Sequence, residues 1–151
     1  MTITIYLFNA VTFTFGSWLI GLIVNNAIKS MPFYPLITNF NFIKKESTNR
    51  AIGITGFKWM VKHTFFKYFN QKLKFEKRPS ISELQNIRNE MVYAEIGHLI
   101  AFIFIFIVTI VIVSSGQFVY AVILLICNII FNLYPSLLQQ KNKNRIDRIL
   151  N

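Results

Sequence analysis

Residues 91–113 read MVYAEIGHLIAFIFIFIVTIVIV, and this stretch indicates a membrane protein. About 20 apolar residues in a helix are enough to cross the roughly 30 Å hydrocarbon core of a bilayer. Two ionisable residues, Glu95 and His98, interrupt the apolar run, and their spacing of three puts them on one face of a helix. A charge at mid-bilayer costs roughly 2.5–3.5 kcal/mol on insertion scales. The pair therefore predicts a functional site within the membrane-spanning part of the helix.

Two further stretches, residues 3–24 and 117–138, are also long and apolar enough to span a membrane. Residues 3–24 lack the basic start and the small-residue cleavage site of a secretory signal, so we expect a retained span. Residues 114–116, Ser-Ser-Gly, predict a short turn between the second and third spans. The sequence therefore predicts an all-α integral membrane protein, a single domain over residues 1–151, with three transmembrane helices.

The positive charge of the chain is concentrated in two segments. The net charge is +10, and all sixteen Lys and Arg residues lie either within 29–88 or within 141–148. Lys and Arg mark the cytoplasmic side of membrane proteins, which predicts an external N-terminus, a cytoplasmic belt at 29–90 and a cytoplasmic tail at 139–151. The bacterial cytoplasmic (inner) membrane is the expected location. Because the charges flank spans, we expect contact with anionic lipid and no nucleic acid.

The belt contains three local patterns. Residues 31–43 are apolar but carry Pro32 and Pro35, which favours a loop or short helix at headgroup level. Residues 57–69 have apolar side chains at helical spacing with lysines off that stripe, which predicts a basic amphipathic helix in the membrane interface. Packing of this helix on partner helices is the alternative. Ser80 and Glu83 predict a capped helix start that continues to Val113.

Polar residues of the second and third spans lie at matching depth. His98 is seven residues from the start of its span, roughly 10 Å by helical rise, and Asn132 is six residues from the end of its span, roughly 9 Å. Spans joined by a tight turn pack antiparallel, so Glu95, His98 and Asn132 are expected to meet. Alternatively, such residues only hold helices together by hydrogen bonds, worth about 1 kcal/mol each.

The residue types favour general base chemistry. Di-iron bundles need two Glu-x-x-His motifs and this chain has one, so neither a metal nor another cofactor is expected. His98 is the candidate base, Glu95 the residue that orients its ring, and Asn132 a donor to a developing oxyanion. Arg88, nearer the cytoplasm on the same stripe, is a candidate for binding a polar head. This set predicts acyl transfer between lipid-soluble partners.

Two segments resemble a known family. Residues 88–98, RNEMVYAEIGH, are similar to the Ala-Glu-x-x-His segment of the bacterial glycosyl-diaponeurosporenoate acyltransferases. Residues 132–146, NLYPSLLQQKNKNRI, resemble the terminal Asn and Pro motif of that family, although Gln140, Lys141 and Lys143 stand where the family usually has Arg, Tyr and Arg. Those enzymes add a fatty acyl group to the sugar of a carotenoid glycoside. The resemblance implies site roles for Glu95, His98, Asn132, Pro135, Gln139, Asn142 and Arg145.

We therefore expect a membrane acyltransferase that modifies a hydroxyl of a glycolipid or glycosylated isoprenoid. The expected catalytic residues are His98 and Glu95, and the expected substrate-binding residues are Arg88, Asn132, Gln139, Asn142 and Arg145. Its partners would be a membrane lipid or other acyl donor and a lipid-soluble glycosylated acceptor. The alternative is a non-catalytic small subunit of a bacterial envelope complex, with membrane proteins as partners.

Overall fold

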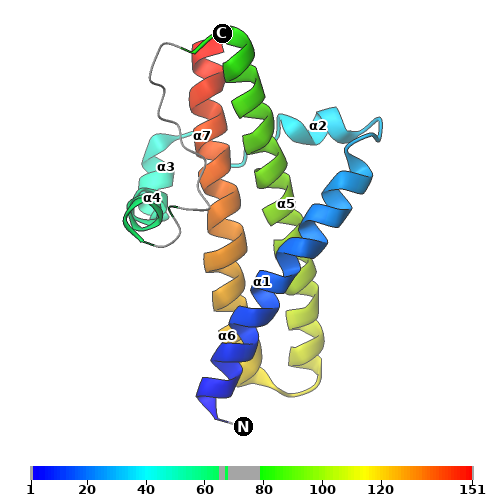
Figure 1. Ribbon diagram of the computed structural model, residues 1–151. Coiled ribbons are helices and arrows are strands. Elements are labelled where there is room, and N and C mark those ends of the chain that lie inside the picture. The colour runs from blue at the N-terminus through cyan, green and yellow to red at the C-terminus, as the bar shows by residue number, and fades with distance from the viewer. Residues whose placement is uncertain (1, 65–66, 68–78, 151) are drawn as a thin grey trace.

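The computed structural model describes residues 2–64, 67 and 79–150, and the regular structure in these ranges is helical (Figure 1). The elements are α1 (Ile3–Ile28), α2 (Tyr34–Thr38), α3 (Glu46–Ala51), α4 (Ile54–His63), α5 (Ile81–Ser114), α6 (Phe118–Asn128), the π-helical turn η2 (Ile129–Leu133) and α7 (Tyr134–Leu150). The predicted all-α class is confirmed.

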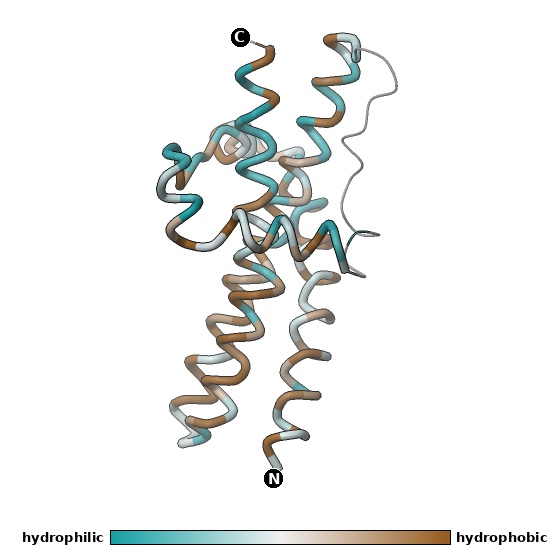
Figure 2. Tube along the Cα trace, turned by 90° about the vertical axis from the view of Figure 1, so that its left-hand side faces the viewer, coloured by the Kyte–Doolittle hydropathy of each residue, from teal (hydrophilic) through white to brown (hydrophobic). Residues whose placement is uncertain are grey.

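Three rods form the body of the molecule: α1, α5, and the continuous run of α6, η2 and α7 (Figure 1). Each is long and apolar enough to cross a membrane, as predicted. The half of the molecule that contains the N-terminus is mainly apolar, and the half that contains the C-terminus is mainly polar (Figure 2). The third rod continues as helix to Leu150, so the expected tail at 139–151 is largely an extension of that rod.

The start of α5 is fixed by a capping box. The Ser80 hydroxyl accepts a hydrogen bond from the Glu83 backbone N–H at 3.2 Å, and the Glu83 carboxylate accepts one from the Ser80 N–H at 2.7 Å. This pairing satisfies two backbone donors that a helix start otherwise leaves open. The helix then runs unbroken to Ser114 and is followed by a turn in which Gly116 adopts a φ of 75°. Both the helix start and the turn were predicted.

Helices α1 and α5 cross at two glycines. The buried residues of α1 are small or polar: Ala10, Thr14, Ser17, Gly21 and Asn25. At the crossing, a Cβ atom built on Gly21 would lie 2.3 Å from the backbone oxygen of Gly97. Only a residue without a side chain fits there, which is the close approach that small residues permit in membrane helices.

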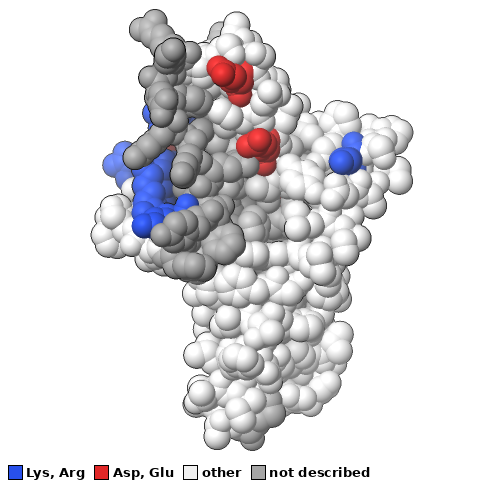
Figure 3. Space-filling view, viewed as in Figure 1, with Lys and Arg blue, Asp and Glu red and all other residues white. Residues whose placement is uncertain are grey.

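Two short belt helices flank the long rods in Figure 1: α2 runs crosswise beside α5, and α4 is seen end-on beside α7. The short helix α2 falls within the expected segment 31–43. Residues 57–63 of the predicted amphipathic helix belong to α4, whereas 65, 66, 68 and 69 lie outside the described residues. Ile54 and Val61 of α4 pack with Leu138 of α7, and Trp59 is exposed. Basic side chains gather on one side of the polar half (Figure 3).

We expect Gly21→Ala to lower thermal stability in detergent, because its Cβ would clash with the Gly97 carbonyl. Gly97→Ala is the matched control: a Cβ there meets nothing within 4 Å. Alanine also stabilises a helix interior relative to glycine by roughly 0.5–1 kcal/mol. Circular dichroism melts of the two purified variants make the comparison. Equal melting temperatures for both would show that α1 and α5 do not approach this closely.

Candidate active site

His98 lines a cavity of about 70 Å³ at the junction of the three rods with α4. Trp18 of α1 and Ile130 and Phe131 of η2 form part of its wall. Helix α7 supplies Pro135, Leu138 and Gln139, and α4 supplies Phe57, Met60 and Val61. The cavity is thus mostly apolar, with few polar groups, which is the lining composition typical of small-molecule sites.

The imidazole of His98 is held between Trp18 and Asn132. Its ring lies edge-to-face with Trp18, at 5.4 Å between centroids and 88° between planes. The Asn132 side chain lies within interaction range of the same imidazole. The expected meeting of His98 and Asn132 at one depth therefore occurs.

Asn132 is fully buried in a polar network between the rods. Its Nδ2 donates to Asn128 Oδ1 at 2.9 Å and to Ser17 Oγ at 3.2 Å, and its Oδ1 accepts from Trp18 Nε1 at 2.8 Å. Both amide hydrogens are thus engaged, so the expected donation to an oxyanion does not fit this geometry. Oδ1 retains acceptor capacity, which suits it to orient a ring N–H of His98.

The π-helical turn is linked to Pro135. Proline has no N–H, so Pro135 cannot donate to the carbonyl of Phe131 four residues earlier. Trp18 Nε1 lies 3.2 Å from that carbonyl oxygen and also donates to Asn132. One indole of α1 therefore helps to satisfy the irregular segment that forms the cavity wall. π-Helical turns frequently occur at functional sites.

Gln139 brings an unpaired amide to the cavity. Its side chain is 8% exposed, and its Oε1 is buried without a hydrogen-bond partner within the described residues. Leaving a buried polar atom unpaired costs about 1–3 kcal/mol, so such an atom beside a cavity is a candidate for ligand binding. This position agrees with the substrate-binding role expected for Gln139.

Glu95 is directed away from His98. Its carboxylate is 2.6 Å from Lys143 Nζ and accepts from Gln140 Nε2 at 2.9 Å. Among the interactions of the described residues, no hydrogen bond or ion pair joins Glu95 to His98, so the expected orienting contact between them is absent there. Positions three apart differ by about 60° around a helix, enough for the two side chains to face different neighbours.

Lys143 is the most informative residue that sequence reasoning missed. It is 1% exposed, and besides Glu95 it donates to the carbonyl oxygens of Thr38 at 3.2 Å and Phe40 at 3.0 Å. Two carbonyl oxygens thus accept from the ammonium group, and the Glu95 carboxylate balances its charge. Lys143 therefore fastens residues 38–40 to α5 and α7. The signal was available in the spacing of Ser136, Gln140 and Lys143, which share one face of α7.

The other predicted residues lie in two further places. Arg88 forms an ion pair with Asp147 and donates to Asn39 Oδ1 at 2.7 Å, so it links α5 to α7 and the belt. Asn142 and Arg145 line a separate basic pocket on α7. Of the predicted substrate-binding residues, only Gln139 lines the His98 cavity.

We expect Lys143→Met to destabilise the protein by about 3–5 kcal/mol, because it leaves the Glu95 carboxylate buried without a cation. Adding Glu95→Gln should recover much of that loss, since a neutral amide needs no counter-charge. Recovery would be incomplete, because the carbonyls of Thr38 and Phe40 still lose their donor. Chemical unfolding in detergent measures each variant. A double variant no more stable than Lys143→Met would contradict the pairing.

A family model described as glycosyl-4,4'-diaponeurosporenoate acyltransferase (CrtO) matches residues 33–151. The matched region includes the residues around the cavity from α4, α5, η2 and α7, and leaves out the whole of α1. Neither the curated proteins nor the solved structures contain a significant match. Since the model covers well over half of the chain, this protein belongs to the glycosyl-4,4'-diaponeurosporenoate acyltransferase family.

Proposed function

We propose that the protein is a membrane-embedded acyltransferase that moves a fatty acyl group to a hydroxyl of a glycolipid or glycosylated isoprenoid. One observation carries this proposal. The only histidine on the long rods and the unpaired amide of Gln139 line the same apolar cavity, within the region matched by an acyltransferase family. The family description favours a glycosylated carotenoid acid as the acceptor class.

In the proposed reaction, His98 removes the proton from the acceptor hydroxyl while that oxygen attacks the acyl carbonyl carbon. The bond between this carbon and the leaving group of the donor then breaks, and the imidazolium returns its proton to the leaving group. Asn132 Oδ1 would hold one ring N–H and leave the other nitrogen as the base. We assign to Glu95 a positioning role, through Lys143 and the backbone of residues 38–40.

Gln139 is the proposed polar contact for the reacting groups. The Gln139 side chain forms no hydrogen bond within the described residues. Its N–H₂ group is therefore available to donate to the oxyanion, and its carbonyl oxygen is available to accept from a sugar hydroxyl. An oxyanion donor contributes roughly 10²–10³-fold to rate. This assignment replaces Asn132, whose amide hydrogens are both engaged.

The surroundings of the cavity suit a fatty chain. A groove of about 490 Å³ between α4 and the α6–η2 segment adjoins the cavity and shares Phe57, Met60 and Ile130 with it. Its other lining residues include Ile126 and Ile129. An acyl chain in this groove would bury apolar surface while its carbonyl reached His98. The groove therefore supports a lipid substrate rather than a polar one.

We expect His98→Gln to lower the acylated product by roughly 10²–10⁴-fold at unchanged protein level, because the general base is lost. His63→Gln is the matched control, since His63 is exposed on α4 and its Nδ1 is in hydrogen-bond contact with the Trp59 carbonyl, outside the cavity. Mass spectrometry of lipid and pigment extracts compares the strains. If the His98→Gln extracts are identical to those of wild type, the proposed acyltransferase function is wrong and a non-catalytic membrane subunit is favoured.

We also propose a multi-pass arrangement in the bacterial cytoplasmic membrane, with the N-terminus and the α5–α6 turn outside. In a Cys127→Ser background, Ser115→Cys should react with a membrane-impermeant maleimide on intact cells. Ser82→Cys, also exposed but at the opposite end of α5, next to the belt, should react only after permeabilisation. The opposite labelling pattern would reverse the topology.

A further inference from the structure

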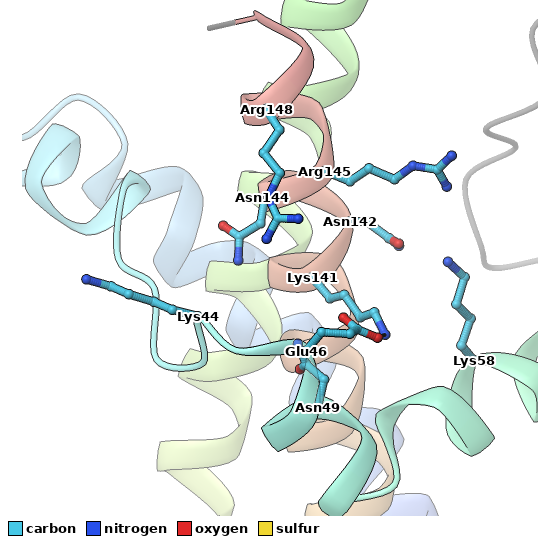
Figure 4. Close-up of a pocket in the computed structure, with 9 residues that line it drawn as sticks. All are labelled: Lys44, Glu46, Asn49, Lys58, Lys141, Asn142, Asn144, Arg145 and Arg148. Atoms are coloured by element: carbon cyan, nitrogen blue, oxygen red, sulfur yellow. Dashed lines mark hydrogen bonds and ion pairs between the residues drawn. The ribbon is translucent and has the colours of Figure 1, made fainter.

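A second pocket, of about 190 Å³, lies on the polar half of the molecule beside α7 (Figure 4). Its lining contains five Lys or Arg residues, three Asn residues and one carboxylate, Glu46. Lys141 forms an ion pair with Glu46 at 2.7 Å. The pocket therefore keeps a strong excess of positive charge.

Besides Lys44 and Arg148, two further cations of the pocket lack a counter-charge within the described residues, Lys58 and Arg145. Neither forms an ion pair or hydrogen bond within the described part of the chain, and both side chains extend toward the same side of α7 (Figure 4). The pKa of Lys58 lies below its ordinary value, first because of burial and then because of repulsion from Lys62, Lys141 and Arg145. A bound anion would relieve that repulsion.

Asn142 points to the same place. It is 6% exposed, lines the pocket, and forms no hydrogen bond among the described residues. In Figure 4 its amide extends between the side chains of Arg145 and Lys58. An amide that opens into the pocket without a protein partner, beside two uncompensated cations, offers a hydrogen-bond donor to a ligand with oxygen acceptors.

Helices α4 and α7 both contribute residues to the basic pocket and to the His98 cavity. Gln139, Asn142 and Arg145 follow one face of α7, with rises of about 4.5 and 9 Å from the first residue. Helix α4 places Phe57, Met60 and Val61 at the cavity and Lys58 at the basic pocket. One extended molecule could therefore occupy both places.

We propose that Lys58, Asn142 and Arg145 bind a phosphate group of the acyl donor while its acyl group lies in the His98 cavity. The second half of this statement rests on the proposed function; binding of phosphate does not. Arg and Lys are the side chains that recognise phosphate oxygens most strongly. A phospholipid and an acyl-coenzyme A both carry this group, and binding measurements distinguish them.

The test is native mass spectrometry of the purified full-length protein in neutral detergent. Three probes are compared: dipalmitoyl phosphatidylglycerol, palmitoyl-coenzyme A and phosphate-free dipalmitoylglycerol. We expect at least one phosphate-bearing probe to bind, and Lys58→Gln or Arg145→Gln to weaken it about tenfold. Lys62→Gln is the matched control: it removes the same charge one turn along α4, outside the pocket, and should weaken binding far less than Lys58→Gln.

Arg145→Lys tests whether the weaker binding of Arg145→Gln comes from the lost charge rather than from a disturbed fold. It should bind more tightly than Arg145→Gln and less tightly than wild type, since it keeps the charge and loses the guanidinium fork. The probe whose affinity depends on Lys58 and Arg145 is the donor class. Equal weakening by Lys62→Gln would reduce the effect to general surface charge and overturn the proposal. The proposal would also be overturned if wild-type protein bound dipalmitoylglycerol as tightly as it binds the two phosphate-bearing probes.

The two proposals fail in different ways. His98→Gln should bind the phosphate-bearing probe normally and form roughly 10²–10⁴-fold less product. If it binds normally and forms as much product as wild type, the acyltransfer mechanism is wrong and the phosphate site stands. If product depends on His98 while no phosphate-bearing probe binds, the enzyme stands and the phosphate site is wrong.

Discussion

The buried ion pair of Glu95 and Lys143 fixes how α7 sits against α5. The lysine is almost fully buried, donates to two backbone carbonyls and forms an ion pair with Glu95, so rotation of α7 would leave a buried charge unpaired. Ser136 and Gln140 contact the backbone and the carboxylate of Glu95 from the same face of α7. With that face committed to α5, the face with Gln139, Asn142 and Arg145 is left for α4, where the cavity and the basic pocket lie.

A second constraint positions α1. Gly21 lets α1 approach the backbone of α5 at Gly97, and this crossing brings Trp18 to the junction of the rods. The Trp18 indole then meets the His98 ring and donates to Asn132 and to the Phe131 carbonyl. The residue proposed as the base is therefore oriented by a helix far away in the sequence. The small residues of α1 therefore both allow close helix packing and place Trp18 beside His98.

The apolar pattern and the local signals predicted the three rods, the capped start of α5 and the turn at Gly116, because each depends on short stretches of chain. The depth match of His98 and Asn132 was also predictable, since it needs only helical rise and an antiparallel pair. The partner of Glu95 was not. Lys143 lies in a segment whose charges predicted a cytoplasmic tail, and its burial depends on the continuation of α7 beside α5.

The chemistry that we propose requires a place where apolar and charged groups can be held by one protein surface. A fatty chain gains free energy by leaving water, whereas a phosphate group needs fixed cations and hydrogen-bond donors. Along α7 the change from Leu138 and Gln139 to Asn142 and Arg145 takes less than two helical turns. On the facing helix α4, Phe57, Met60 and Val61 line the cavity, whereas Lys58 lines the basic pocket. Two helices that change character together in this way would hold a lipid-like donor in one orientation, with its carbonyl near the histidine.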